Sequence, residues 1–282
     1  MIRKVFLILV LLASTNATAA EIEFPSSSGN VSFNDILALA SNSASSSYAY
    51  GSDNPQLQYA ELWLPGNATI VQKAPVVVFI HGGCWLNSFN IAYTHPFSTA
   101  LSQAGYAVWS LEYRRTGDEG GGWPGTYEDI KAGLEFLDSL QNQPIDTSNI
   151  VISGHSAGGH LALLTGTEYP QLNGVIGLAA IADIVSYSQG SNSCQTVTAD
   201  FMGGDYDSMP DAYSTANPAG KTLHEDTVLL QGDIDSIVPV EQSRLRGANT
   251  IIQDGAGHFD WVHPGTPAFA RFLESLEQAF AQ

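Results

Sequence analysis

Apolar positions along the chain follow two patterns that alternate. Short runs rich in β-branched and aromatic residues, typical of buried strands, occupy residues 59–64, 76–80, 107–111, 150–153, 175–179, 227–231 and 250–252. Longer stretches in which apolar residues recur every three or four positions, typical of amphipathic helices, occupy residues 93–103, 127–140, 157–166, 240–245 and 267–281. This alternation predicts an α/β fold with a mostly parallel central sheet and helices on both of its faces.

Two segments depart from the alternation. Residues 21–56 are rich in serine and asparagine, and we expect either a mobile lead-in or a packed, extended arm there. Residues 183–220 are long for a connection without clear structure, but Phe201 and Met202 argue against a disordered loop and fit a short helix. The remaining length suits one domain over residues 57–282 that contains this insertion.

A serine with glycines on either side lies directly after a predicted strand. The run Gly154-His155-Ser156-Ala157-Gly158 joins this strand to the predicted helix at residues 157–166. In this setting G-x-S-x-G holds a serine in a strained elbow with its Oγ exposed, and side chains in place of the glycines would collide with the neighbouring strand and helix. Ser156 is therefore the candidate nucleophile. The alternative is an ordinary glycine-rich turn, which the five residues alone leave open.

A base for this serine comes from a later segment. A serine hydroxyl is a useful nucleophile only when a base accepts its proton and an acid orients that base, and in this architecture both follow the serine along the chain. His258 follows a predicted strand, whereas His263 fits a surface or capping role beside the last helix. His155 and His160 lie too close to the serine in the chain to act easily as its base, so we expect them to serve in packing.

Hydrogen-bond donors for a developing negative charge come from an earlier loop. The run His81-Gly82-Gly83-Cys84-Trp85 follows another predicted strand at once. Because glycine lets the chain turn backbone amides inward, we expect the N–H groups of Gly83, Cys84 and Ala157 to form an oxyanion hole. We expect His81 to brace this loop rather than to react.

These motifs, in this order and each after a strand, resemble the α/β-hydrolase serine esterases, close to the hormone-sensitive-lipase-like and feruloyl-esterase-like branches. The resemblance covers about residues 57–282 and includes a further stretch made of Glu112-Tyr113-Arg114-Arg115, Trp123-Pro124 and Glu128-Asp129. It departs from the family's H-G-G-G at Cys84, where only a backbone amide is needed. It implies the α/β-hydrolase fold, a cap over the active site formed by residues 183–220, and a structural ion pair between Arg114 and Asp129.

The acid is selected by a second resemblance. Asp233 and Asp235 lie two residues apart, so in an extended loop they point in opposite directions and only one of them can face His258. The spacing from Gly232 to Pro239 resembles the G-x-x-D-x-x-V-P segment of the prolyl-oligopeptidase and dienelactone-hydrolase branches. This resemblance selects Asp235 as the acid and leaves Asp233 as a loop-capping residue.

The cysteines and two tryptophans have candidate roles around this site. Cys84 lies in the oxyanion loop and Cys194 in the insertion, and an even cysteine count in an exported chain favours a disulfide between them. Such a bond would tie the cap to the oxyanion loop; the alternative is two buried free thiols. We single out Trp85 and Trp123 as candidate walls of the substrate pocket, although most aromatic residues are expected in the core.

The N-terminus has the pattern of a secretory signal peptide at residues 1–20. Arg3 and Lys4 precede the apolar run at residues 5–13, and small residues at 17–20 offer a cleavage site. We therefore expect a secreted or periplasmic protein; a retained anchor is the alternative. Cleavage would leave eight basic against 28 acidic residues, a formal charge of −20, which disfavours nucleic acid and anionic membranes as partners.

Taken together, these features predict a cofactor-independent serine hydrolase that acts on small-molecule carboxylic esters. The chain lacks metal-binding H-x-x-E-H or C-x-x-C motifs, calcium-loop spacing, a P-loop and a dinucleotide G-x-G-x-x-G after a strand, so we expect no metal and no cofactor. An amide-cleaving relative, arylformamidase-like or a small peptidase, is one alternative. A catalytically silent hydrolase fold used for binding is the other. The oligomeric state does not follow from the sequence.

Overall fold

The computed structural model describes residues 21–282, and the predicted signal peptide at residues 1–20 lies outside the described residues. Across the described residues the chain forms an eight-stranded sheet in the order β1-β2-β4-β3-β5-β6-β7-β8. The strands are β1 (Ser46–Ala49), β2 (Tyr59–Trp63), β3 (Ala74–Ile80), β4 (Ala107–Leu111), β5 (Ile145–His155), β6 (Gly174–Leu178), β7 (Thr227–Gly232) and β8 (Asn249–Gln253). The β1–β2 and β2–β4 pairs are antiparallel and the other neighbouring pairs are parallel, which confirms the predicted mostly parallel sheet.

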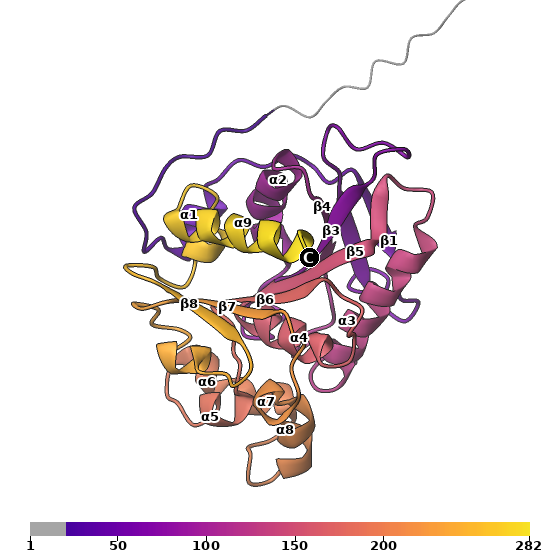
Figure 1. Cartoon of the computed structure of the whole chain (residues 1–282). Coiled ribbons are helices and arrows are strands. Elements are labelled where there is room, and N and C mark those ends of the chain that lie inside the picture. Colours follow the sequence, from indigo (N-terminus) through magenta and orange to yellow (C-terminus); the bar gives the residue numbers. More distant parts are fainter. Residues whose placement is uncertain (1–20) are drawn as a thin grey trace, which may run out of the picture.

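The sheet separates two apolar layers, because successive side chains of a strand point to opposite faces. The helices that cover the sheet are α2 (His95–Gln103), α3 (Gly125–Glu135), α4 (Ala157–Gly166) and α9 (Pro267–Phe280). In β3, Val78 packs in the layer that contains α3 and α4, whereas its neighbour Phe79 packs in the layer that contains α2 and α9. Figure 1 shows α2 and α9 on one side of the strands and α3 and α4 on the other.

The differences from the predicted elements lie at helix ends and at the sheet edge. Tighter turns η1 (Ile91–Thr94) and η2 (Phe136–Ser139) take the place of helix ends, and η4 (Val240–Ser243) replaces the helix expected at residues 240–245. Strand β1 was not predicted, because its side chains alternate between half-buried and exposed and form no apolar run. An edge strand of this kind is stabilised by pairing with its neighbour, which a local pattern does not reveal.

The serine-rich segment before the domain packs against it. We call residues 21–45 the N-terminal arm; it contains the short helix α1 (Phe33–Leu37). The backbone of Ile22 exchanges two hydrogen bonds with the side chain of Gln103, at 3.1 and 3.0 Å. Further along, the N–H of Ser27 donates to the carbonyl oxygen of Gly265 at 2.9 Å. Of the two expectations for this segment, the packed arm is the one observed.

The insertion at residues 183–220, which we call the cap, consists of short helices. They are α5 (Ile184–Tyr187), α6 (Ser193–Thr196), α7 (Thr198–Met202), α8 (Pro210–Ala216) and the turn η3 (Pro218–Gly220). Phe201 and Met202 are each only 1% exposed, as expected for residues that argue against a disordered loop. The cap helices lie together beyond β7 and β8 in Figure 1.

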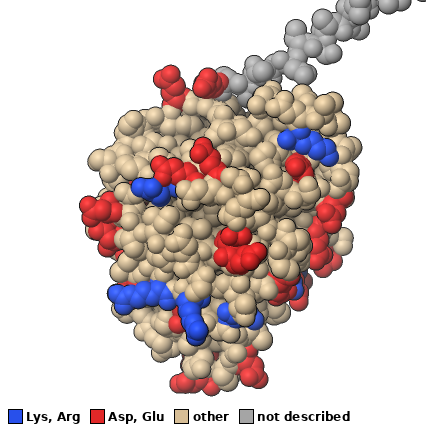
Figure 2. All heavy atoms as spheres, viewed as in Figure 1, with Lys and Arg blue, Asp and Glu red and all other residues tan. Residues whose placement is uncertain are grey.

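The surface follows the composition. Acidic side chains are spread in separate groups over the face in Figure 2 and basic ones are fewer, in keeping with the formal charge of −18 for the whole chain. The face shown therefore offers no broad basic surface to an anionic partner. Within residues 21–282, no helix has both the length and the apolar character needed to cross a membrane.

Candidate active site

Ser156 lies at the turn between β5 and α4 with a strained backbone. Its φ is +58° and its ψ is −119°, a left-handed conformation that a residue with a side chain rarely adopts and that is typical of a nucleophile elbow. A Cβ on Gly154 would lie 2.2 Å from the carbonyl oxygen of Gly158, and a Cβ on Gly158 would lie 2.1 Å from that of Ile80. The two glycines are therefore required for the close packing around the turn.

Asp235 and His258 form a buried hydrogen-bonded pair after β7 and β8. The carboxylate Oδ2 lies 2.8 Å from His258 Nδ1, and Oδ1 accepts backbone hydrogen bonds from Ile237 and Val238 at 2.8 and 2.9 Å. Burial disfavours the charged carboxylate, but attraction to His258 and these hydrogen bonds outweigh it, so the pKa of Asp235 is lowered. The carboxylate is thus held ionised where it can orient the imidazole.

The two residues that were weighed against this pair have other contacts. Asp233 Oδ1 accepts a hydrogen bond from the N–H of Gly255 at 2.8 Å, which is a loop-capping contact of the kind expected. His263 is buried rather than on the surface, and its Nδ1 accepts from the N–H of Gly265 at 3.1 Å. Both side chains are therefore used to hold loops.

The loop at residues 81–85, which we call the oxyanion loop, passes directly beside Ser156. A Cβ on Gly82 would lie 3.0 Å from the Cβ of Ser156. Gly83 and Cys84 have left-handed φ angles of +113° and +52°, and neither N–H group has a hydrogen-bond acceptor among the described residues. Ala157 is the first residue of α4, a position where N–H groups lack a partner within the helix. The three amides named from the sequence therefore lie in segments beside Ser156, and their role as oxyanion donors stays a prediction.

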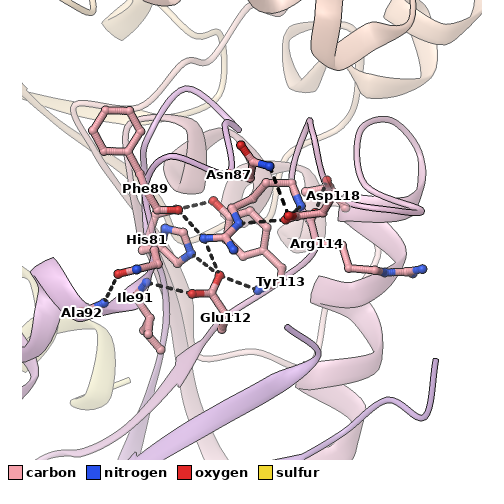
Figure 3. A network of polar contacts seen from close by, with 12 residues as sticks. His81, Asn87, Phe89, Ile91, Ala92, Glu112, Tyr113, Arg114 and Asp118 are labelled. Carbon is pink, nitrogen blue, oxygen red and sulfur yellow. Dashed lines mark hydrogen bonds and ion pairs between the residues drawn. The ribbon is translucent and has the colours of Figure 1, made fainter. Parts of the chain in front are cut away.

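The start of the oxyanion loop is braced by a buried polar network (Figure 3). His81 Nε2 lies 3.0 Å from a carboxylate oxygen of Glu112, and its ring stacks on Tyr113 with 4.4 Å between centroids. Glu112 also accepts from the N–H of Ile91 at 3.0 Å and pairs with Arg115 at 3.2 Å. Burial raises the pKa of Glu112, but attraction to His81 and Arg115 and its hydrogen bonds lower it overall. His81 holds the loop in place, as the sequence indicates.

The ion pair expected between Arg114 and Asp129 is confirmed. Two guanidinium nitrogens donate to the two carboxylate oxygens at 2.9 and 2.7 Å, and Asp129 is almost fully buried. Gln58 adds a hydrogen bond of 2.7 Å to the same carboxylate. Bidentate pairs of this kind have a fixed geometry, so this one fixes the chain after β4 against α3.

His155, inside the elbow sequence, connects several parts of the site. Its ring is fully buried between Tyr93 and His258, with Nδ1 3.2 Å from the hydroxyl of Tyr93 and Nε2 2.9 Å from the carbonyl oxygen of His258. The same Tyr93 hydroxyl accepts from the N–H of Gly82 at 2.7 Å. Burial lowers the pKa of His155 to about 3, so the ring is neutral at ordinary pH. Packing, the role expected from the sequence, is thus only part of what His155 does.

Ser156 and His258 line one cavity of about 140 Å³. Much of its wall is aromatic, with rings contributed by Phe33, Phe89 and Phe259. A larger groove of about 330 Å³ lies elsewhere, beside α3 and the start of β5, but no histidine lines it. Within residues 21–282, no three side chains of histidine, cysteine, aspartate or glutamate are grouped so as to hold a metal ion. The chemistry is therefore assigned to the smaller cavity.

The two tryptophans singled out as pocket walls do not line this cavity. Trp85 is fully buried, has a left-handed φ of +57°, and stacks on Phe201 of the cap at 4.6 Å between ring centroids. Trp123 stacks on Tyr127 at 5.5 Å and is half-buried. Phe33, which does line the cavity, carried no signal in the sequence, because it lies in the serine-rich arm far from the motifs.

Cys84 and Cys194 form a disulfide, as the sequence favours. Both residues line the cavity, Cys84 from the oxyanion loop and Cys194 from α6 of the cap. The bond therefore ties the cap to the loop at residues 81–85. Of the cap, only the start of α6 reaches the cavity.

Comparison with known proteins agrees with this geometry. The family model BD-FAE matches residues 61–248, which is more than half of the chain. Among curated relatives, Esterase LipC of Mycobacterium tuberculosis is 25% identical over 271 residues, covering 83% of this chain and 65% of LipC. Neutral cholesterol ester hydrolase 1 of Pongo abelii is 37% identical over 105 residues, covering 34% of this chain and 24% of that protein. The chain thus spans less than two thirds of the length of these relatives.

The fold is also found among solved structures. Esterase B from Lactobacillus rhamnosis superposes with a TM-score of 0.73 at 20% identity, covering 88% of this chain and 90% of that one. At this level of identity the likeness concerns the fold alone, and it is the fold expected from the strand order and the elbow. The chain is an α/β hydrolase and belongs to the BD-FAE family.

Proposed function

We propose that the protein is a serine hydrolase that cleaves carboxylic esters through an acyl-enzyme on Ser156. The observation that carries the proposal is one cavity in which a serine in the elbow conformation meets the hydrogen-bonded pair of Asp235 and His258. The unpartnered amides of Gly83 and Cys84 border the same cavity. Two relatives, Esterase LipC and neutral cholesterol ester hydrolase 1, are named as ester hydrolases, which favours esters over amides as substrates.

The reaction follows from the roles that this geometry allows. Ser156 Oγ attacks the ester carbonyl carbon while His258 Nε2 accepts the hydroxyl proton, and the carbonyl oxygen becomes an oxyanion. The amides of Gly83, Cys84 and Ala157 donate to that oxygen, where charge develops in the transition state. His258 then gives its proton to the departing alkoxide, which leaves as the alcohol. Asp235 accepts a hydrogen bond from Nδ1–H and stabilises the charged imidazolium.

Hydrolysis of the acyl-enzyme repeats these roles with water. His258 Nε2 accepts a proton from water as its oxygen attacks the acyl carbon, and the same proton returns to Ser156 Oγ as the acid departs. Ser156 Oγ and His258 Nε2 share no hydrogen bond among the described residues, a contact that often forms only with substrate in place. No cofactor is required in any of these steps.

A substrate panel tests the proposal. It contains 4-nitrophenyl esters of rising acyl length, N-formylkynurenine and peptide anilides, assayed with the wild type and with Ser156→Ala. We expect hydrolysis of esters, lowered by roughly 10⁴-fold or more in Ser156→Ala without loss of folding. Ser193→Ala is the matched control, because Ser193 lines the same cavity but lies at the start of α6 rather than in the elbow. It should keep most of the activity.

The other outcomes discriminate between the remaining hypotheses. Hydrolysis of the amides in preference to the esters would favour an amide-cleaving relative. A wild type that is silent across the panel would favour a binding protein. Ser156→Ala with near wild-type single-turnover rates would remove Ser156 as the nucleophile, and melting curves show whether each variant is folded.

We also propose that the protein is exported after cleavage of a signal peptide at residues 1–20. The pattern of Arg3 and Lys4 before an apolar run supports this, as does the Cys84–Cys194 disulfide, because such bonds persist mainly in oxidising compartments. Sequencing the N-terminus of the protein recovered from its producing cells tests it. A mature chain that begins near Glu21 is expected, and an intact N-terminus at Met1 would contradict cleavage.

A further inference from the structure

One wall of the active-site cavity comes from outside the catalytic segments. Phe33 lies in α1 of the N-terminal arm and lines the cavity together with Ser156. Its ring contacts three other aromatic rings, with centroid distances of 5.7 Å to Phe89, 5.5 Å to Tyr93 and 5.4 Å to Phe259. The arm is thus part of the cavity lining. Through Phe33 it contacts Phe89, which follows the oxyanion loop, and Phe259, which directly follows His258.

The short helix that carries Phe33 is held by a cap at its N-terminus and by one buried side chain. Ser32 and Asp35 form a reciprocal cap, in which each side chain accepts a hydrogen bond from the other residue's N–H, at 3.3 and 2.7 Å. On the opposite side Ile36 is 1% exposed and packs in the apolar layer that contains α2 and α9. The burial of Ile36 and the Ser32–Asp35 cap therefore help to fix α1, and with it the position of the Phe33 ring.

A buried carboxylate joins the arm to the loop that carries His258. Asp260 is fully buried and accepts backbone hydrogen bonds from Asn30 at 2.7 Å, from Val31 at 3.1 Å and from Gly257. Gly257 directly precedes His258, whereas Asn30 and Val31 directly precede Ser32, the N-cap of α1. Hydrogen bonds to an ionised group are among the stronger ones, and a buried carboxylate needs them. Asp260 thus holds the two segments in one arrangement.

We propose that Phe33 is a specificity-determining residue, held over the cavity by the contacts of Asp260, and that its ring limits the size of the ester group accepted beside Ser156. This inference rests on the proposed esterase function. The cavity of about 140 Å³ is smaller than the roughly 300–1,000 Å³ typical of small-molecule pockets. Together with its aromatic lining, this volume selects esters with a short or compact apolar group.

Changing the size of residue 33 tests the proposal through a ratio of activities. Phe33→Ala is assayed with two series, 4-nitrophenyl esters of rising acyl length and acetates of rising alcohol length. We expect the ratio of kcat/KM for long over short substrates to rise in at least one series, by about fourfold for each extra methylene that the enlarged cavity buries. Phe33→Trp should lower the same ratio. If Phe33→Ala does not fold, Phe33→Leu makes the smaller change in the same direction.

Two further variants separate a wall from a general structural role. Phe280→Ala is the matched control, because Phe280 is also half-buried and also contacts an aromatic ring, Tyr106, but does not line the cavity. It should leave the ratio unchanged. Asp260→Asn removes an acceptor from the contacts with the arm, so the ratio should shift in the same direction as for Phe33→Ala, with faster amide exchange at residues 29–33.

Two different results separate the role of Phe33 from the proposed esterase function. Ratios that stay at the wild-type value in both series for Phe33→Ala, while hydrolysis still depends on Ser156, would overturn the role of Phe33 alone. A wild type without Ser156-dependent ester hydrolysis would overturn the proposed function, and the specificity role with it.

Discussion

The groups that carry the proposed chemistry and the walls of the cavity beside them are positioned by different kinds of contact. Ser156 directly follows β5 and His258 lies in the loop after β8, and close backbone packing leaves the elbow no room for side chains at Gly154 or Gly158. Parts of the wall come from the arm and the cap, segments far apart in the chain that are joined to the site by the Asp260 carboxylate and the Cys84–Cys194 bond. The candidate catalytic groups are thus positioned by the sheet, and parts of the cavity wall are positioned by a few long-range contacts.

The largest effect is expected on the sheet side of this comparison. Asp235→Asn should lower kcat by about 10³- to 10⁴-fold, because the amide can favour the wrong tautomer of His258 and cannot stabilise the imidazolium. Asp233→Asn, the matched control, should change kcat by at most about threefold, because Asp233 holds Gly255 and not the histidine. Steady-state kinetics on both variants provide the measurement. Equal losses in the two variants, or the reverse ranking, would show that the wrong carboxylate was assigned.

Removing the disulfide tests how far the walls depend on a single tie. The bond closes a loop of 110 positions, so the chain-entropy model gives about 4–5 kcal/mol of unfolding free energy, less any strain in the folded state. Cys84→Ala together with Cys194→Ala should therefore lower the denaturation midpoint. It should also lower kcat, because the Cys84 amide is a proposed oxyanion donor whose contact strengthens in the transition state.

If the double variant kept both its denaturation midpoint and its kcat, the disulfide would have no role in holding the cavity wall. Loss of stability with unchanged kcat would show instead that the oxyanion loop is held by the His81–Glu112 network without help from the cap. Guanidinium denaturation curves and steady-state kinetics on the same samples separate these results.

The smallest effect concerns His155, which contacts Tyr93 and His258. Its folded-state pKa of about 3 lies below the ordinary value of 6.5, so between these pH values the unfolded chain binds a proton that the folded protein does not. Folding stability therefore falls as the pH falls through this window, and His155 accounts for about 2 kcal/mol between pH 7 and pH 5. His160, with a pKa lowered to about 4 by burial, adds a similar dependence.

The variant His155→Gln isolates this contribution. It should be less stable than the wild type at pH 7, because two buried hydrogen bonds change, but its free energy of unfolding should fall less between pH 7 and pH 5. Urea denaturation at the two pH values measures the difference. An unchanged pH dependence would mean that His155 is protonated as readily in the folded protein as in the unfolded chain.

Much of the chemistry was predictable because it depends on short sequence features beside strands. Ser156, His258 and the amides of Gly83 and Cys84 each follow a predicted strand, and parallel strands bring their carboxyl ends to one edge of the sheet. Trp85 follows a strand too, yet it was wrongly expected in the pocket. The residue type predicts that a tryptophan is buried, but it does not predict which residues surround it. Only the structure shows that Trp85 packs on Phe201 of the cap.

The sequence by itself determined the alternating strands and helices, the steric need for the elbow glycines and the order of the candidate nucleophile, acid and base along the chain. These follow from local sterics and from the period of apolar side chains, which act over a few residues. The tertiary structure alone decided that β1 pairs at the sheet edge, that Asp260 binds the arm and that Phe33 lines the cavity. The last two contacts join residues more than a hundred positions apart, and the β1 pairing joins segments separated by a loop, so no local pattern reports any of them.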